Sequence, residues 1–407
     1  MNQMNRQEVS TAVSIGILYI IRMLGLFMVI PVLPLVADVP GMAPVLLGLA
    51  LGIYGLSQGF LQIPLGRLSD RIGRKPIILG GLVVLAVGSV IAAYAETAGG
   101  IVLGRLLQGC GAIASTLLAL VSDHIRPDHR GKAMAIVGSC IGGSFGLALF
   151  AGPWIYASLG LSGVFSVTAG LAALGMVIVL ILLPRDVEPQ GSGSHQIWGV
   201  LLSNRDLQRT SFSSMALHFQ LMSGFLVFPV MMVEQLGINV SDYPLTLLLI
   251  LVVSFLAAVP LMMATDRWPE RRKTLMVLMI GVLGLSLVGM QIQPGAWWLV
   301  LVLGSFFMAF NVLEMMLPNL VSLYSSESMR GAAMGVHTSA QFFGAFAGGA
   351  LGGWLIAMAD SSMMLWVNAG IALSWFIIML WMNPTHRQPP VDQSSNVAAT
   401  SDSPETV

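Results

Sequence analysis

Apolar segments of about 20 residues recur along almost the whole chain, and they restrict what it can fold into. As a helix, each segment is long enough to cross about 30 Å of hydrocarbon. Only 9% of the residues are charged, against about 25% in ordinary soluble domains. The sequence therefore predicts an all-α membrane protein. We place its twelve transmembrane helices, in two sets of six, at 10–36, 43–65, 76–95, 99–121, 132–156, 162–183, 208–235, 243–264, 274–292, 296–322, 331–357 and 362–382.

The two sets of spans predict two bundles and two polar segments. An internal repeat supports this division, because a shift of 200 residues aligns Arg130-Gly131 with Arg330-Gly331 and Trp154 with Trp354. The last segment is rich in Pro, Ser and Asp, a composition typical of disorder. The predicted parts are an N-terminal six-helix bundle at 1–183, a cytoplasmic linker at 184–207, a C-terminal six-helix bundle at 208–384 and a disordered cytoplasmic tail at 385–407.

Positive charge is distributed unevenly between the loops. Of the 19 lysines and arginines, Arg22 and Arg105 fall inside spans, and the others all lie in the tails or in alternate loops. Cytoplasmic loops carry an excess of Lys and Arg. We therefore expect a multi-pass protein of the bacterial inner membrane with both termini in the cytoplasm.

Several function classes are disfavoured by composition and by motifs. The formal net charge is zero, which argues against a nucleic-acid partner. Cys110 and Cys140 both lie in apolar segments and are interpreted as core residues rather than a disulfide or a metal pair. The sequence has no Walker A loop, so an ATP-driven pump is not expected. We expect no enzyme activity, no cofactor and no metal.

One polar stretch, at 66–76, separates the second and third spans. Its pattern is G-x-L-x-D-R-x-G-R-K-P, with Arg67 before the leucine. Gly66 and Gly73 permit close backbone approach or a positive φ, and Asp70 is placed to meet a helix N-terminus or an arginine. The stretch resembles the loop between helices 2 and 3 of the major facilitator superfamily of secondary transporters.

Further motifs extend this resemblance over the chain up to about residue 384. Residues 105–112 resemble the family's R-x-x-Q-G-x-G-A signature, and the glycine-rich run 138–153 resembles its antiporter signature, with a Gly-Pro that comes late. The segments 22–28, 52–56 and 310–314 resemble the bacterial YajR-type inner-membrane transporters. Those transporters often carry a C-terminal soluble domain, and we expect this chain to lack regulation through one.

The resemblance implies two pseudo-symmetric six-helix bundles, the arrangement of this superfamily. It also implies a charge cluster at the cytoplasmic surface that latches the two sides together in the outward-open state. The residues that match this latch are Gly66, Asp70, Arg71, Gly73, Arg74 and Asp123.

Polar residues inside spans cost free energy in the bilayer, so they are rarely present without a function. Four of them are candidates for proton coupling. Glu314 is the only acidic residue in the middle of a span, and burial favours the protonated form of a carboxyl group. His218 titrates near physiological pH, and either His218 or Arg22 is the expected partner of Glu314. Arg105 is the fourth candidate. Each has a structural alternative, namely a packed neutral Glu314, a structural His218, and hydrogen-bond anchors at Arg22 and Arg105.

Other polar side chains predict a substrate cavity. Tyr54, Gln58 and Gln62 are spaced four residues apart, so they share one face of a helix. Asn311 and Gln341 add polar groups within spans of the second set. We expect these five side chains to line a cavity that is otherwise apolar.

The sequence as a whole predicts a monomeric, proton-coupled secondary active transporter that contacts the lipid bilayer, a small solute and protons. An apolar cavity suits an amphipathic or drug-like solute, exported by proton antiport through alternating access. Two alternatives stay open: an importer or uniporter of a small metabolite, and a non-transporting membrane receptor on the same fold.

Overall fold

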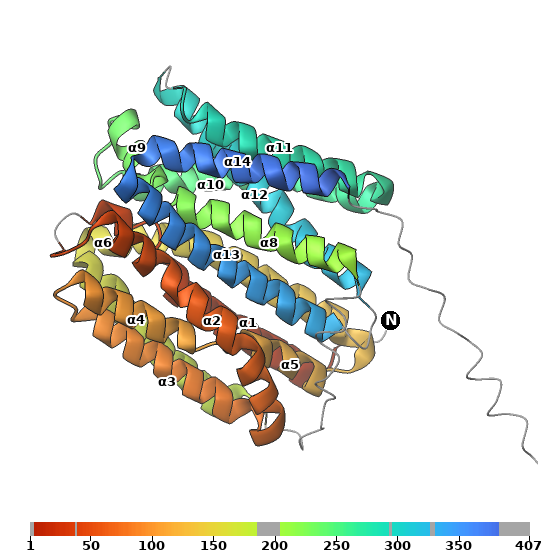
Figure 1. Ribbon diagram of the computed structural model, residues 1–407. Coiled ribbons are helices and arrows are strands. Elements are labelled where there is room, and N and C mark those ends of the chain that lie inside the picture. Colours follow the sequence, from red (N-terminus) through yellow and green to blue (C-terminus); the bar gives the residue numbers. More distant parts are fainter. Residues whose placement is uncertain (1–3, 37–38, 185–203, 293–294, 326–329, 382–407) are drawn as a thin grey trace, which may run out of the picture.

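The computed structural model describes residues 4–36, 39–184, 204–292, 295–325 and 330–381. In these residues the regular elements are all helices, which lie side by side in one bundle (Figure 1). The predicted linker and tail fall largely or wholly outside the described residues. We refer to residues 4–184 as the first half and residues 204–381 as the second half.

The helices of the two halves follow in chain order. The first half contains α1 (Arg6–Phe27), η1 (Leu33–Leu35), α2 (Pro44–Ile72), α3 (Arg74–Ala93), α4 (Ala98–Cys110), α5 (Ala114–His124) and α6 (Pro127–Leu182). The second half contains α8 (Arg205–Gly224), α9 (Phe228–Leu236), α10 (Tyr243–Arg267), η2 (Pro269–Arg271), α11 (Arg272–Gly289), α12 (Ala296–Tyr324), α13 (Arg330–Met358) and α14 (Ser361–Leu380).

The helices account for the predicted number of spans. Among the described residues, ten helical stretches are long and apolar enough to cross a membrane, and α8 with α9 forms an eleventh, bent by 43°. One of the ten stretches runs for 55 residues through α6, which at 1.5 Å per residue is more than twice the thickness of a bilayer. Gly160 breaks it with φ 68° and ψ −172°. Two spans therefore lie within α6, which gives twelve.

The polar stretch at 66–76 is more helical than the sequence indicates. Helix α2 continues to Ile72 and α3 starts at Arg74, so Gly73, with φ 100°, is the only residue between them. Polar side chains do not end a helix when water can solvate them, so α2 continues through its polar last turn. Of the eleven residues in this polar stretch, only Gly73 is therefore not helical. Its positive φ would be strained in a residue with a side chain.

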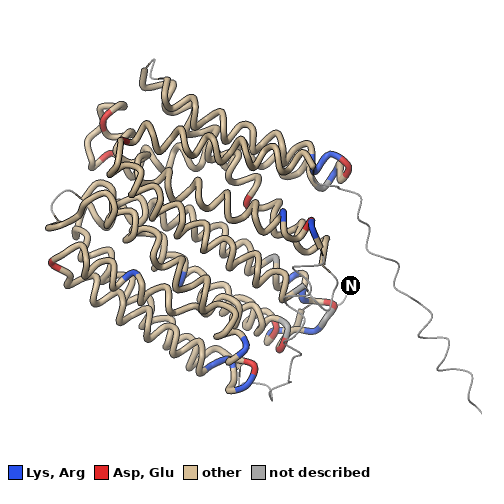
Figure 2. The backbone as a smooth tube through the Cα atoms, in the orientation of Figure 1, with Lys and Arg blue, Asp and Glu red and all other residues tan. Residues whose placement is uncertain are grey.

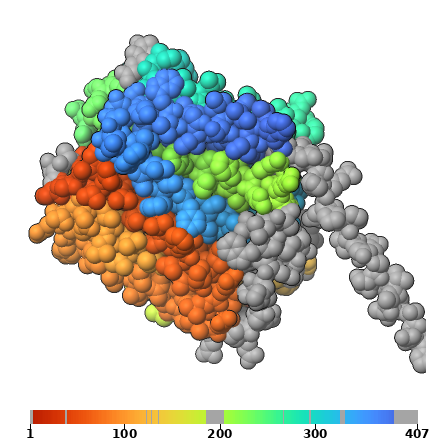
Figure 3. All heavy atoms as spheres, in the orientation of Figure 1, coloured from red at the N-terminus to blue at the C-terminus, as the bar shows by residue number. Residues whose placement is uncertain are grey.

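Helices α2 and α13 bring the two halves together and lie side by side on the face seen in Figure 3. A Cβ atom at Gly48 would overlap the carbonyl oxygen of Gly349, and one at Gly353 would overlap that of Pro44. The two backbones therefore touch where α2 begins and α13 ends. This end of the bundle is closed along the α2–α13 contact.

At the opposite end, which we call the open end, three glycines have free space beside them. Phe145 of α6 stacks on Phe310 of α12, and Gly138 and Gly142 precede Phe145 on the same face of α6. A Cβ atom at either glycine, or at Gly335 on α13, would have no neighbouring atom within 4 Å.

Most lysines and arginines gather at this open end, where the N-terminus also lies (Figure 2). The predicted asymmetry of charge is present in the structure. The assignment of the charged end to the cytoplasm stays a prediction of the positive-inside rule.

Candidate functional site

Five aromatic side chains form a layer that joins the two halves. Phe27 of α1 lies 6.2 Å from the ring of Tyr54 and 5.3 Å from that of Phe145, measured between ring centroids. Phe145 lies 5.9 Å from Phe310 of the second half, and Tyr54 lies 6.3 Å from Phe342 of α13. We call Phe27, Tyr54, Phe145, Phe310 and Phe342 the aromatic layer. Phe310 and Phe342 bring the second half into it.

The structure brings Glu314, His218 and Gln341 together beside this layer, and we call them the Glu314 cluster. Gln341 Nε2 donates a hydrogen bond to Glu314 Oε1 at 3.1 Å and lies 2.6 Å from His218 Nε2. Three helices supply the cluster, namely α8, α12 and α13. The sequence predicted each residue but could not show that they meet.

The hydrogen bonds of His218 indicate a neutral ring. Its Nδ1 lies 3.1 Å from the backbone oxygen of Ser214, which can only accept, so Nδ1 carries the hydrogen. Its Nε2 faces the amide nitrogen of Gln341, which can only donate, so Nε2 is the acceptor. The 3.7 Å between His218 Nε2 and Glu314 Oε2 is too long for a hydrogen bond. His218 is therefore a neighbour of Glu314 rather than its counter-ion in this arrangement.

Glu314 and His218 differ in exposure. The side chain of Glu314 is 39% exposed, whereas that of His218 is 7% exposed. Glu314 also lies one helical turn beyond Phe310 on α12, toward the open end. The carboxyl group of Glu314 is therefore more accessible than the ring of His218.

Arg105 is fully buried, and two of its three side-chain nitrogens have hydrogen-bond partners, while Nη2 has none among the described residues. Its Nε donates to the carbonyl of Ala50 at 3.0 Å, and its Nη1 donates to the carbonyl of Leu26 at 3.1 Å and to Gln108 Oε1 at 2.8 Å. Its guanidinium carbon lies 4.5 Å from the centre of the Tyr54 ring. These contacts join α1, α2 and α4, and they match the structural alternative for Arg105.

Arg22 is buried to the same degree but is not satisfied. Only 1% of the residue is exposed, and none of its three side-chain nitrogens has a hydrogen-bond partner in the described part of the chain. Its guanidinium carbon lies 6.0 Å from the centre of the Phe342 ring. The structure therefore places Arg22 at the aromatic layer, without a described contact to Glu314.

The polar stripe of α2 is buried. Tyr54, Gln58 and Gln62 are at most 2% exposed, and both amide atoms of Gln58 lack hydrogen-bond partners among the described residues. Tyr54 packs edge-on against Phe342, so the stripe faces the second half at this level. Asn311 is partly buried on α12 beside Phe310.

The predicted latch residues meet within the first half. Arg74 of α3 pairs with Asp70 of α2, and its Nε lies 2.9 Å from Asp123 Oδ2 of α5. Arg74 Nη1 also donates to Ser69 Oγ at 2.6 Å. Gly66 brings α2 close to Ser115, whose hydroxyl would lie 3.0 Å from a Cβ atom there. Arg71 is exposed at the end of α2.

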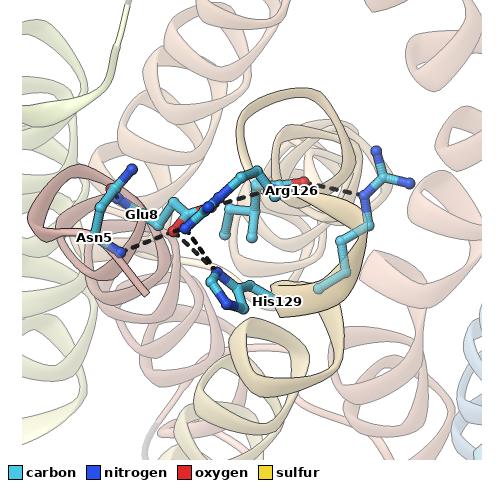
Figure 4. A network of polar contacts seen from close by, with 6 residues as sticks. Asn5, Glu8, Arg126 and His129 are labelled. Carbon is cyan, nitrogen blue, oxygen red and sulfur yellow. Dashed lines mark hydrogen bonds and ion pairs between the residues drawn. The ribbon is translucent and has the colours of Figure 1, made fainter. Parts of the chain in front are cut away.

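The sequence interpretation missed a buried network at the start of α1 (Figure 4). Glu8 is 3% exposed. It accepts hydrogen bonds from Arg126 Nε at 2.9 Å and Nη2 at 3.1 Å, and its Oε2 lies 3.1 Å from His129 Nδ1.

A capping box explains this network. Asn5 caps α1 while Glu8 bonds back to the Asn5 amide. Helix α1 therefore starts at Arg6, four residues before the predicted start of the first span at residue 10. The N-x-x-E pattern at residues 5–8 was the signal that could have found the helix start.

Comparison with known proteins agrees with this architecture. The family model of the Major Facilitator Superfamily matches residues 15–228 and 210–402. The chain belongs to this superfamily. It is 37% identical over 397 residues to the inner membrane transport protein YajR of Escherichia coli K12, covering 95% of this chain and 86% of YajR. The protein is therefore a membrane transporter of this type and not an enzyme.

A weaker sequence match and a solved structure with the same fold agree with this. The chain is 25% identical to the multidrug resistance protein MdtH of Aeromonas salmonicida, over 90% of this chain and 93% of MdtH. A solved structure of a bacterial homologue of the human lysosomal transporter Spinster, inward-facing and unoccupied, superposes with a TM-score of 0.69 at 12% identity. It covers 93% of this chain and 95% of that one.

Proposed function

We propose that this superfamily member is a proton-coupled secondary transporter that exports a small amphipathic solute across the bacterial inner membrane by proton antiport. The observation that carries the proposal is the Glu314 cluster. A carboxyl group on a membrane-spanning helix contacts side chains from two other spans, yet its side chain is 39% exposed. Acidic residues within spans mark proton and ion pathways in transporters.

The neighbours of Glu314 can hydrogen-bond to its carboxyl group in either protonation state. The charged carboxylate accepts the hydrogen bond from Gln341, as the structure shows it. The protonated acid is a donor, and His218 Nε2, 3.7 Å away, can accept its hydrogen once the Gln341 amide has moved off that nitrogen. Because the neutral acid costs less in an apolar interior, the protein can change conformation with the proton bound.

The open and closed ends support alternating access. The halves touch at Gly48 and Gly349, whereas the backbone at Gly142 and at Gly335 has free space beside it. With the charged end in the cytoplasm, this arrangement is inward-facing. In the outward-facing state the closed end opens and the open end closes. The aromatic layer lies between the two ends in both states.

We assign Arg74, Asp70 and Asp123 the role of the cytoplasmic latch. In this structure Arg74 joins the ends of α2, α3 and α5 within the first half. Loss of the Asp70 charge removes one of its two carboxylate partners. We expect Asp70→Asn to cripple transport while insertion into the membrane persists, and normal transport by this variant would refute the role.

The decisive experiment uses the full chain in proteoliposomes with an imposed pH gradient. Glu314→Gln is expected to abolish gradient-driven accumulation of a transported solute, while binding and gradient-free exchange persist. Glu234→Gln, the same change at an exposed position on α9, is the control and should behave as wild type. Full accumulation by Glu314→Gln would place the proton site elsewhere.

The same vesicles separate the alternatives. Solute flux that ignores the pH gradient identifies a uniporter, solute that enters with protons identifies an importer, and binding without flux identifies a receptor. The similarity to a multidrug resistance protein supports export of drug-like solutes. Cysteine labels near Arg271 and near Ala98 should react from opposite sides of the membrane, the first from the cytoplasm.

A further inference from the structure

Arg22 is a buried cation that the fold does not satisfy. An arginine side chain carries five N–H donors, and in Arg22 none of its nitrogens is hydrogen-bonded in the described part of the chain. An unpaired charge is costly inside a membrane protein, and such residues are retained where they serve transport. The fold supplies aromatic neighbours, but it supplies Arg22 with no described carboxylate or carbonyl.

Gln58 lies at the same depth as Arg22. Consecutive spans run in opposite directions. Because Phe27 of α1 and Tyr54 of α2 are in contact, these two residues lie at the same level along the bundle. Arg22 precedes Phe27 by five residues, about 7.5 Å, and Gln58 follows Tyr54 by four residues, about 6 Å. Both displacements point toward the open end. Gln58 is fully buried, and its amide atoms also lack partners among the described residues.

The Glu314 cluster lies at this depth in the second half. Glu314 follows Phe310 of the aromatic layer by four residues, about 6 Å toward the open end. A positive group of the first half and an acidic group of the second half therefore lie just beyond the same aromatic layer. Tyr54 and Phe342 form an edge-to-face pair beside Arg22 and are both buried in this conformation.

We propose that Arg22 and Gln58 form the subsite for a negatively charged group, such as a carboxylate, on the transported solute. The planar guanidinium matches a carboxylate with two parallel hydrogen bonds, and the Gln58 amide adds a further donor. The apolar body of the solute rests on the aromatic layer.

The solute class follows from the proposed function, on which this step rests. Proton antiport requires that the solute compete with the proton at Glu314. An anion alone does not compete, because a nearby negative charge favours the protonated carboxyl group. The solute is therefore an amphipathic zwitterion, with its carboxylate at Arg22 and a protonated amine at Glu314.

Three matched probes test the subsite by binding to the full chain in lipid nanodiscs without a pH gradient. These are para-aminomethylbenzoate, which carries both charges, para-methylbenzoate, which lacks the amine, and para-methylbenzylamine, which lacks the carboxylate. Wild type is expected to bind the zwitterion most tightly. Arg22→Gln should weaken the binding of both carboxylates by about tenfold to a hundredfold and leave para-methylbenzylamine unchanged.

Conservative variants keep the test independent of folding. Arg22→Lys retains the charge without the planar fork and should restore part of the lost affinity, and Gln58→Leu should weaken the carboxylates alone. Equal binding of the carboxylates by wild type and Arg22→Gln overturns the subsite, as does a wild type that prefers the amine alone. These outcomes leave proton coupling untouched, because Glu314→Gln in the gradient assay tests it separately.

Discussion

Arg22 and Arg105 are two buried arginines of the same half, and their surroundings are opposite. Arg105 makes three hydrogen bonds and lies over the face of Tyr54. Arg22 makes none within the described residues and lies near Phe342. At most 1% of either residue is exposed. Burial alone therefore does not tell a structural arginine from one that is available to a ligand, whereas the partners of the guanidinium do.

A helix end supplies one of the hydrogen-bond partners of Arg105. Helix α1 ends at Phe27, so the carbonyl of Leu26 is one of the last four that lack an intrahelical donor. Arg105 supplies that donor, while Gln108 lies three residues further along α4 on the same surface. Gln108 is held in turn by its hydrogen bond to Ser89 at 2.9 Å. No helix end offers such a carbonyl to Arg22 among the described residues.

The largest effect is expected from Arg105→Met. The change leaves the carbonyl of Leu26 and the amide oxygen of Gln108 buried without this donor. We expect a loss of about 3–5 kcal/mol of folding free energy, measured by thermal unfolding in lipid nanodiscs. Arg6→Met, at an exposed position, is the control. Equal stability of the two variants would contradict the contrast between Arg105 and Arg22, because the hydrogen bonds of Arg105 would then not stabilise the fold.

A smaller loss is expected from Gln108→Leu, which removes the link between Arg105 and Ser89. Two buried hydrogen bonds disappear, at a cost of about 1–3 kcal/mol. Combined with Arg105→Met, the loss should be less than the sum of the two single losses, since both changes break one network. Strict additivity in the same unfolding assay would show that Gln108 and Arg105 act independently.

The smallest effect on stability is expected from Arg22→Met. The change removes a buried charge that has no described partner, and the methionine replaces it with apolar surface. We expect a stability within about 1 kcal/mol of wild type, or above it, together with loss of carboxylate binding. A destabilisation as large as that of Arg105→Met would show that Arg22 is also a structural anchor.

The sequence by itself determined the features that depend on local composition. Apolar segments of bilayer length gave the twelve spans, and the positions of lysine and arginine predicted the charged end. The cost of a polar group in a membrane was enough to select Glu314, His218, Gln341, Arg22 and Arg105 as candidates. Each of these inferences uses a residue and its neighbours in the chain, and needs no knowledge of how the helices pack.

The tertiary structure decided which of these residues meet. It brought His218 and Gln341, rather than Arg22, to Glu314, and it joined Glu8 to Arg126 across 118 residues of sequence. It also supplied Arg105 with carbonyls from 55 and 79 residues away. Spacing along one helix fixes the face on which a side chain lies, but the partner on that face comes from another helix. Only the packing of the spans could therefore show that Arg105 has hydrogen-bond partners on other helices, while Arg22 has none among the described residues.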